Sequence, residues 1–216
     1  MSKKPKKINY LNGTRLHRAM VAGIRTVVSN QDYLNKINVF PVPDGDTGTN
    51  MAFTLTAILD TPFNKVNSRV DDMLVLVADS ALDGARGNSG AILAQFFQGV
   101  SDGASGVSQF DPLTFSIAIQ KGSQYARDAL SEPQEGTILT VISDFSNKLK
   151  ELIESGIDDF EQILSKGVEE AERSLKNTPN LMDLLQKAGV VDAGAQGFVN
   201  FLEGIHEFIR TGSLRE

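Results

Sequence analysis

Residues 38–51 read NVFPVPDGDTGTNM, and this stretch is the most informative part of the 216-residue chain. Pro41 and Pro43 fix their own φ angles and disfavour helix in the residue before each, which predicts a stiff, extended segment. Asp44 and Asp46 follow two residues apart, and two carboxylates on one turn can bind the same hard cation, such as Mg²⁺. The stretch therefore predicts an extended loop with a candidate metal site.

The same stretch continues into a predicted helix start at Thr47, Gly48, Thr49 and Asn50. The first turn of a helix has free backbone N–H groups and the positive end of the helix dipole, so it favours an anion such as a phosphate. Glycine lets the backbone approach a ligand closely. The alternative is an ordinary capped helix, because Asp, Thr and Asn are common N-cap and turn residues.

Three further segments have the same character. GARGNSG occupies residues 84–90, EGT residues 135–137 and DAGAQG residues 192–197, and each precedes an apolar helical pattern. Any one of them alone is typical of a plain helix start with a glycine for packing. Four such starts in one small chain predict a shared site for a polyanion with a metal-binding rim, provided that the helix starts meet on one side.

Apolar residues recur every three or four positions along most of the chain, which is typical of amphipathic helices. One such stripe is Ile138, Ile142, Phe145, Leu149 and Leu152. Strand signals are scarce, and no linker or internal repeat divides the chain. The sequence predicts one all-α domain of about eight helices, at residues 12–30, 48–60, 70–83, 88–101, 112–129, 137–155, 158–177 and 195–211, with Gly103–Ser108 as the longest flexible loop and Pro179 opening a short helix through residue 187.

The composition excludes several classes of protein. The chain has no cysteine and only two histidines, which excludes disulfide scaffolds, thiolate catalysis and metal sites rich in these residues. A net charge of −6 makes it a poor candidate for nucleic-acid binding, which needs a cationic face.

The N-terminal residues are interpreted as a tail. Four lysines lie within residues 1–10, which we expect to be a flexible basic tail ahead of a single domain over residues 11–216. No apolar run is long enough for an integral membrane segment, and no signal peptide is recognisable, so the cytoplasm is the expected compartment.

The motifs together resemble the N-terminal nucleotide-binding domain of bacterial fatty acid kinase catalytic subunits, within the dihydroxyacetone kinase L-subunit superfamily. The matching stretches, in family order, are NVFPVPDGDTGTNM (38–51), GARGNSGAILAQFFQG (84–99), EPQEGTILTVISD (132–144) and VVDAGAQGFVNFLEG (190–204). The resemblance implies an eight-helix antiparallel barrel that binds ATP or ADP with the loops at one end.

The resemblance also implies the residues of the site. It places two Mg²⁺ ions on Asp44 and Asp46, and the third metal-ligand position falls nearest to Asn38, where a neutral amide replaces an aspartate. Arg86 is added to these catalytic residues on physical grounds, as a clamp for the γ-phosphate, with a surface salt bridge as the alternative. The implied nucleotide-binding residues are Thr47, Gly48, Thr49, Asn50, Asn88, Ser89, Gly136, Thr137, Asp192, Ala193 and Gly194.

In that family the acceptor of the γ-phosphate is a fatty acid carboxylate, which a separate acyl-binding partner protein presents. A carboxylate is ionised at neutral pH and needs no general base, which agrees with the lack of a candidate catalytic His or Cys. Family subunits continue into regions for self-association, as a homodimer, and for partner binding. We therefore expect a Mg²⁺-dependent kinase domain that forms acyl phosphate and that, if excised, binds nucleotide but phosphorylates poorly alone.

Two other hypotheses stay open. The first is a kinase subunit for a small hydroxyketone such as dihydroxyacetone. The second is a helical adaptor or lipid-binding module, in which the glycine turns only cap helices. The barrel interior has two interpretations, a lipid-sized space or, as favoured, a close-packed core, and the aromatic residues concerned are Phe96, Phe97, Phe198, Phe201 and Phe208.

Overall fold

The computed structural model describes residues 7–60 and 68–211. Within them the chain forms ten helices and two short antiparallel strands. In chain order these are β1 (Leu11–Asn12), α1 (Gly13–Ser29), α2 (Gln31–Lys36), α3 (Thr47–Leu59), α4 (Val70–Asp83), α5 (Gly87–Gly103), β2 (Gln109–Phe110), α6 (Pro112–Asp128), α7 (Ile138–Glu154), α8 (Phe160–Leu181), α9 (Asp183–Ala188) and α10 (Ala193–Thr211). The predicted all-α class is confirmed.

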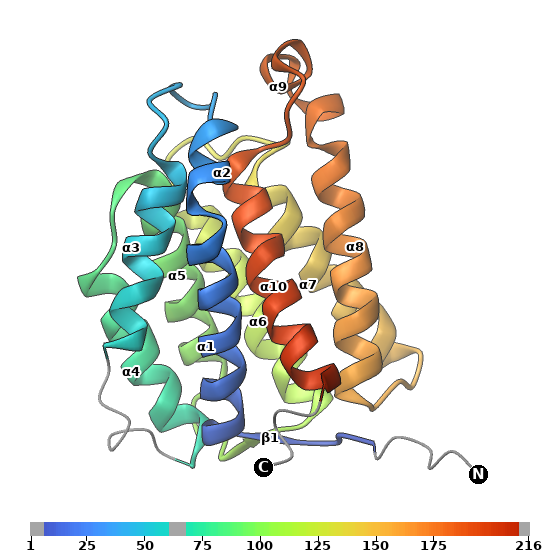
Figure 1. The fold of residues 1–216 in the computed structure, drawn as a ribbon. Coiled ribbons are helices and arrows are strands. Elements are labelled where there is room, and N and C mark those ends of the chain that lie inside the picture. The colour runs from blue at the N-terminus through green and yellow to red at the C-terminus, as the bar shows by residue number, and fades with distance from the viewer. Residues whose placement is uncertain (1–6, 61–67, 212–216) are drawn as a thin grey trace.

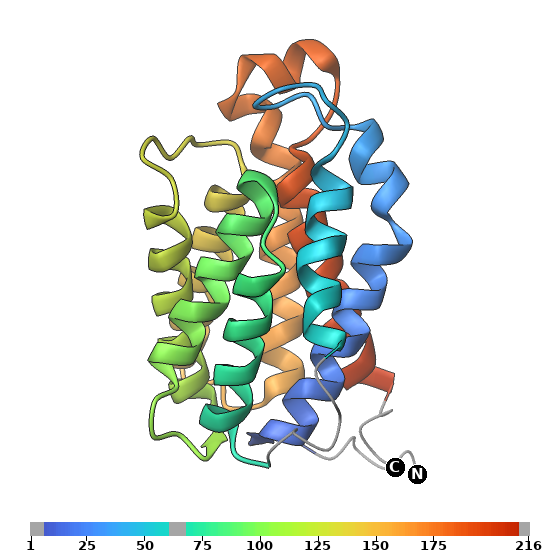
Figure 2. The same cartoon turned by 90° about the vertical axis from the view of Figure 1, so that its left-hand side faces the viewer.

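Eight longer helices run alternately up and down and surround a common interior, while α2 and α9 are short additions at one end (Figure 1). We call this end the upper end and the opposite end, where β1 lies, the lower end. α3, α5, α7 and α10 begin at the upper end, and the other long helices begin at the lower end (Figures 1 and 2). The four helices that begin at the upper end are therefore the four whose starts carry the glycine motifs.

The apolar stripes of the helices fill the interior. On α1, Met20 and Ile24 are buried at the expected helical spacing, and the predicted stripe on α7 is buried throughout. Phe198 packs edge-to-face against Phe96 and Phe145, with ring centroids 5.6 and 6.0 Å apart. Aromatic rings favour this geometry because the positive edge of one ring meets the negative face of the other. The helical periodicity in the sequence thus becomes one continuous apolar core.

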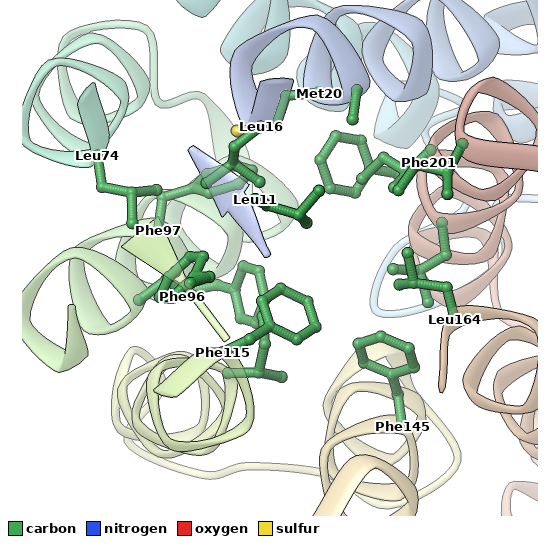
Figure 3. Close-up of a pocket in the computed structure, with 17 residues that line it drawn as sticks. Leu11, Leu16, Met20, Leu74, Phe96, Phe97, Phe115, Phe145, Leu164 and Phe201 are labelled. Atoms are coloured by element: carbon green, nitrogen blue, oxygen red, sulfur yellow. The ribbon is translucent and has the colours of Figure 1, made fainter. Parts of the chain in front are cut away.

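A small apolar cavity of about 60 Å³ lies inside the barrel beside β1 and β2, between the side chains drawn in Figure 3. Phe96, Phe97 and Phe201 line it, Phe198 lies in the packed core, and Phe208 is only partly buried against that core. An apolar cavity of roughly 150 Å³ holds one benzene molecule. The cavity between these side chains is therefore too small for a lipid tail, as expected for a close-packed core.

Close approach of the first and last long helices closes the barrel. A Cβ atom on Gly23 of α1 would lie 2.6 Å from the carbonyl oxygen of Phe201, and one on Gly204 of α10 would lie 2.8 Å from the carbonyl oxygen of Ala22. No side chain fits at such distances, so glycine at both positions lets the two backbones approach. α1 and α10 consequently pack side by side, although they are far apart in sequence.

Two local predictions are wrong, and one short helix was not predicted. Pro179 does not open a helix but lies inside α8, which ends at Leu181, and the short helix after it is α9. Pro179 has no N–H group, so it cannot form the helical hydrogen bond to the carbonyl oxygen of Leu175. The Thr178 hydroxyl donates to that oxygen instead, at 2.8 Å. The predicted helix over 12–30 is followed directly by a second one, α2, and the connections at residues 37–46 and 129–137 are longer than the predicted longest loop.

The predicted tail is anchored where the structure describes it. Lys7 Nζ lies 2.5 Å from Asp158 Oδ1, and the N–H group of Ile8 donates to Asp159 Oδ1 at 3.1 Å. The carbonyl oxygen of Ile8 accepts from the N–H group of Phe160 at 2.9 Å. Residues 7–8 are thus held against the start of α8, and the rest of the lysine cluster lies outside the described residues.

Candidate functional site

The starts of α3, α5, α7 and α10 lie at the upper end of the barrel (Figures 1 and 2). Residues at or next to all four starts line one pocket. The pocket has a volume of about 290 Å³, and every one of the four sequence motifs contributes to its wall. Its lining consists of Phe40, Pro41, Thr47, Asn88, Ser89, Ile92, Leu130, Ser131, Glu132, Gln134, Thr137, Ile138, Asp192 and Gly194. The fold thus brings together segments from both halves of the chain.

The loop that leads into α3 is organised by Asn38, which is 5% exposed. Its Oδ1 atom accepts from the N–H groups of Asp46 and Thr47 at 3.2 and 3.0 Å, and its Nδ2 atom donates to the carbonyl oxygens of Phe40 and Val42, both at 3.2 Å. Both acceptor positions of the amide oxygen are therefore in use. In the structure Asn38 supports the loop, which differs from the expected role of third metal ligand.

The two aspartates of the loop are exposed, next to the pocket residue Thr47. Asp46 occupies the N-cap position of α3, yet its side chain makes no capping hydrogen bond. Asp111 and Asp159, by contrast, do cap α6 and α8. The carboxylate of Asp46 is therefore available for a cation.

No group of three or more His, Asp or Glu residues that could hold a metal ion by itself is found across residues 7–60 and 68–211. A cation at Asp44 and Asp46 would consequently depend on oxygens from water and from a bound ligand, which is the usual situation for Mg²⁺.

The predicted residues at the start of α3 face in different directions. Only Thr47 lines the pocket. The side chain of Thr49 accepts from Asn35 Nδ2 at 2.9 Å, and its N–H group donates to Asn35 Oδ1 at 3.0 Å, so Thr49 is bound to α2. A Cβ atom on Gly48 would collide with the backbone of α2, so this glycine allows close packing of α2 on α3. Asn50 lies against the start of α5.

At the start of α5, Asn88 and Ser89 line the pocket, but Arg86 does not. The side chain of Arg86 is exposed, and its guanidinium carbon lies 3.3 Å from the centre of the Phe53 ring. The structure therefore places the Arg86 side chain on an aromatic ring outside the pocket, and not in the expected position of a phosphate clamp.

At the start of α7, Thr137 both lines the pocket and caps the helix. Its hydroxyl accepts from the N–H group of Leu139 at 3.3 Å and donates to the carbonyl oxygen of Gln134 at 2.7 Å. Gly136 has a φ of 81° and does not line the pocket, and a Cβ atom there would lie 3.0 Å from the carbonyl oxygen of Thr178. Glycine at this position is explained by backbone conformation and packing.

The connection between α6 and α7 supplies pocket residues that the sequence analysis did not single out. Glu135 holds this connection in place, because it accepts from the Thr140 hydroxyl at 2.5 Å and from Arg127 at 2.8 Å. These bonds favour the ionised carboxylate and lower the pKa of Glu135. The only sequence signal was the EPQEGT stretch of the third motif, and the residues missed are Leu130, Ser131, Glu132 and Gln134.

Asp192 joins two helix starts. It is 5% exposed, and its Oδ2 atom accepts from the N–H groups of Ala195 in α10 and Ile138 in α7, at 2.8 and 3.0 Å. Burial raises the pKa of Asp192 to about 6, although the two N–H groups act in the opposite direction. Asp192 and Gly194 line the pocket, whereas Ala193 is buried and does not.

The described side chains that line the pocket are acidic or neutral, which is unusual for a site predicted to bind a polyanion. Among the described residues that line it, none is Lys, Arg or His, and two are acidic, Glu132 and Asp192. Its side-chain donors are hydroxyl and amide groups, while the helix-start N–H groups of Thr47 and Ile138 already donate to Asn38 and Asp192. Binding of a polyanion would therefore require a cation from solution to offset the like charges.

Residues 41–207 of the chain match the DAK2 domain family. Protein YloV of Bacillus subtilis (strain 168) is 38% identical over 204 residues, which cover 91% of this chain and 35% of YloV. The uncharacterized protein SERP0792 of Staphylococcus epidermidis is 35% identical over 197 residues, which cover 91% of this chain and 36% of that protein. The chain thus spans about a third of the length of these relatives.

A solved structure shares the fold. The dihydroxyacetone kinase from C. freundii in complex with AMP-PNP and Mg²⁺ matches with a TM-score of 0.67 and 16% sequence identity, over 96% of this chain and 36% of the kinase. Its native form matches with a TM-score of 0.64. Within residues 7–60 and 68–211, no helix has the length and hydrophobicity needed to cross a membrane. The family match and the shared fold confirm the predicted resemblance, and the chain belongs to the DAK2 domain family.

Proposed function

We propose that this domain binds ATP with Mg²⁺ in the upper-end pocket and transfers the γ-phosphate to a fatty acid carboxylate presented by an acyl-binding partner protein. The observation that carries the proposal is the convergence of four helix starts on one pocket of about 290 Å³. Helix starts favour phosphate because their N–H groups and dipoles point toward it. Membership of the DAK2 family and the fold shared with a kinase add support.

Asp44 and Asp46 are the residues that would hold Mg²⁺. Both are exposed, and the carboxylate of Asp46 is not used for capping, so the donor chemistry fits a hard cation. When bound, Mg²⁺ supplies positive charge that offsets the charge of the phosphate oxygens.

The side chains of the pocket would orient the nucleotide. Hydroxyl and amide donors at Thr47, Asn88 and Ser89 lie beside the aspartate loop, which suits the phosphates. The acceptor carboxylate needs no deprotonation. Its oxygen forms a bond to the γ-phosphorus, the bond from that phosphorus to the bridging oxygen breaks, and ADP leaves with the electron pair. Alignment of the reactants is thus the main contribution of the protein.

A small hydroxyketone is the second candidate for the acceptor, favoured by the fold shared with dihydroxyacetone kinase. A hydroxyl acceptor must lose a proton during transfer, whereas a carboxylate does not. The described lining has no histidine, but it has carboxylates at Glu132 and Asp192 that could accept such a proton. An assay with both kinds of acceptor therefore decides between them.

Nucleotide binding is tested by thermal unfolding of the purified domain with ATP or ADP, each with and without Mg²⁺. At a nucleotide concentration of 100 times Kd, binding stabilises the fold by about 2.7 kcal/mol, so we expect Tm to rise by roughly 5–10 °C with Mg²⁺ and far less without it. An unchanged Tm under all conditions would favour the adaptor hypothesis, in which the glycine turns only cap helices.

The acceptor is tested by following ADP release with two kinds of substrate. With the domain, we expect dihydroxyacetone to leave the rate of ADP release at its value without acceptor. With a full-length relative such as YloV, we expect palmitate bound to a purified acyl-binding protein to raise that rate. Turnover of dihydroxyacetone by the domain would instead support the second candidate.

A further inference from the structure

An exposed aromatic residue on α3 lies under the only arginine of the four motifs. Phe53 is 45% exposed, and the guanidinium carbon of Arg86 lies 3.3 Å from the centre of its ring. At this distance the guanidinium group is in direct contact with the face of the ring, an arrangement that arginine favours because its charge is delocalised and weakly hydrated. The contact joins the middle of α3 to the residue that precedes α5.

Neighbouring residues on the same face of α3 hold the same turn. The side-chain oxygen of Thr54, which is fully buried, accepts from the N–H group of Arg86 at 3.3 Å. Asn50 lies against Gly87, where a Cβ atom would be 2.5 Å from Asn50 Nδ2. Residues 50, 53 and 54 are spaced as neighbours on one helix face, so one face of α3 fixes the ring stack, the backbone N–H group and the glycine of the turn.

This turn determines where one wall of the pocket lies. Asn88 and Ser89 follow it directly and line the pocket, whereas Arg86 and Phe53 do not. We propose that Phe53 is a positioning residue: it holds the guanidinium group of Arg86 and thereby fixes the start of α5 for phosphate binding. This inference rests on the proposed nucleotide site. Arg86 is then an anchor for this turn and not a clamp on the γ-phosphate.

The physical reason is preorganisation. A helix start binds an anion well when its N–H groups already point at the ligand, because no ordering cost is then added at binding. Gly87 has a φ of 60° and is exposed, so the turn has no bulky side chain of its own to restrain it. Together with the hydrogen bond from the N–H group of Arg86 to Thr54, the stack of Arg86 on Phe53 restrains the turn from outside the pocket.

The test is a double-mutant cycle on the affinity of the domain for two probes, ADP and AMP-PNP, both with Mg²⁺, measured by isothermal titration. We expect Phe53→Ala to weaken both probes by the same factor, about fivefold. Arg86→Ala should have the same effect, and the double variant should be no weaker than either single variant. Phe53→Tyr, which keeps the ring, should bind like the wild type.

The matched control is Tyr10→Ala. Tyr10 is 46% exposed and carries Arg15 at 5.2 Å from its ring centre, but it precedes β1 at the lower end. This variant should leave both affinities unchanged, and the Tm of each free variant reports whether its fold is intact.

Two results would overturn the inference alone. One is wild-type affinity in Phe53→Ala, and the other is an Arg86→Ala variant that loses more affinity for AMP-PNP than for ADP, which would show a direct contact with the γ-phosphate. Failure of the wild type to bind either probe would overturn the proposed function and this inference with it, so the two failures are distinguishable.

Discussion

Replacing Asp44 and Asp46 together with alanine is expected to weaken the binding of ADP in the presence of Mg²⁺ by about 100-fold or more. The described lining of the pocket has no cationic side chain, and it includes the acidic residues Glu132 and Asp192. The charge of the phosphates must therefore be offset by a cation, and the two exposed loop aspartates are the residues proposed to hold it. Each lost charge-assisted contact is worth about 1.5–3 kcal/mol, and about 2.7 kcal/mol corresponds to a factor of 100 in Kd.

Isothermal titration of the wild type and the double variant, each with Mg²⁺ and with EDTA, measures this effect. The wild type in EDTA should bind as weakly as the double variant in Mg²⁺, because both lack the cation. Asp32→Ala/Asp183→Ala is the matched control, since it removes two exposed carboxylates in α2 and α9 without changing the loop. Equal affinity in the wild type and the loop variant would contradict the proposed metal site.

The stability of the domain is expected to rise, relative to that of Asp192→Asn, by about 3 kcal/mol as the pH falls from above 6 to below 4. The ordinary pKa of an aspartate is 3.8, and burial raises that of Asp192 to about 6 in the folded chain. Between these values the folded chain binds a proton that the unfolded chain does not. This stabilisation is fully present below the unfolded pKa and is lost as the pH rises through 6.

Urea unfolding of both proteins between pH 4 and pH 8 measures the difference. Asp192→Asn is the appropriate reference because its amide oxygen can still accept from Ile138 and Ala195, while the charge is removed. Carboxylates whose pKa is lowered, such as Glu135, act in the opposite direction but equally in both proteins, so they cancel. If the free energies of unfolding of the two proteins changed with pH in parallel, Asp192 would have an ordinary pKa in the folded chain.

The fold was predictable because its main determinant is local. The helix expected over residues 70–83 has those bounds in α4, and apolar spacing alone was sufficient there. The errors occurred where a side-chain hydrogen bond decided the local structure. Asn30 ends α1 by donating from its side chain to the carbonyl oxygen of Thr26 at 2.8 Å, and α2 follows. Periodicity contains no information on such bonds.

The site was predictable only in part. The motifs identified the four turns that meet at the pocket, because glycine and polar residues at a helix start are visible in sequence. The direction in which each side chain points depends on its neighbours in space. The side chain of Thr49 is bound to α2, and Arg86 stacks on Phe53. Asn38 was expected to bind a metal ion, but its side chain forms hydrogen bonds within the loop that leads into α3.

The contact between α1 and α10 has a consequence for synthesis on the ribosome. The helix that completes the barrel is made last, and Asp192, which joins the starts of α7 and α10, emerges just before it. Until then α1 can pack against α3 and α4, but the surface that α10 covers stays exposed on the nascent chain. Because Asp192 and Gly194 line the pocket, its wall is complete only once the start of α10 has been made and has closed against the earlier helices.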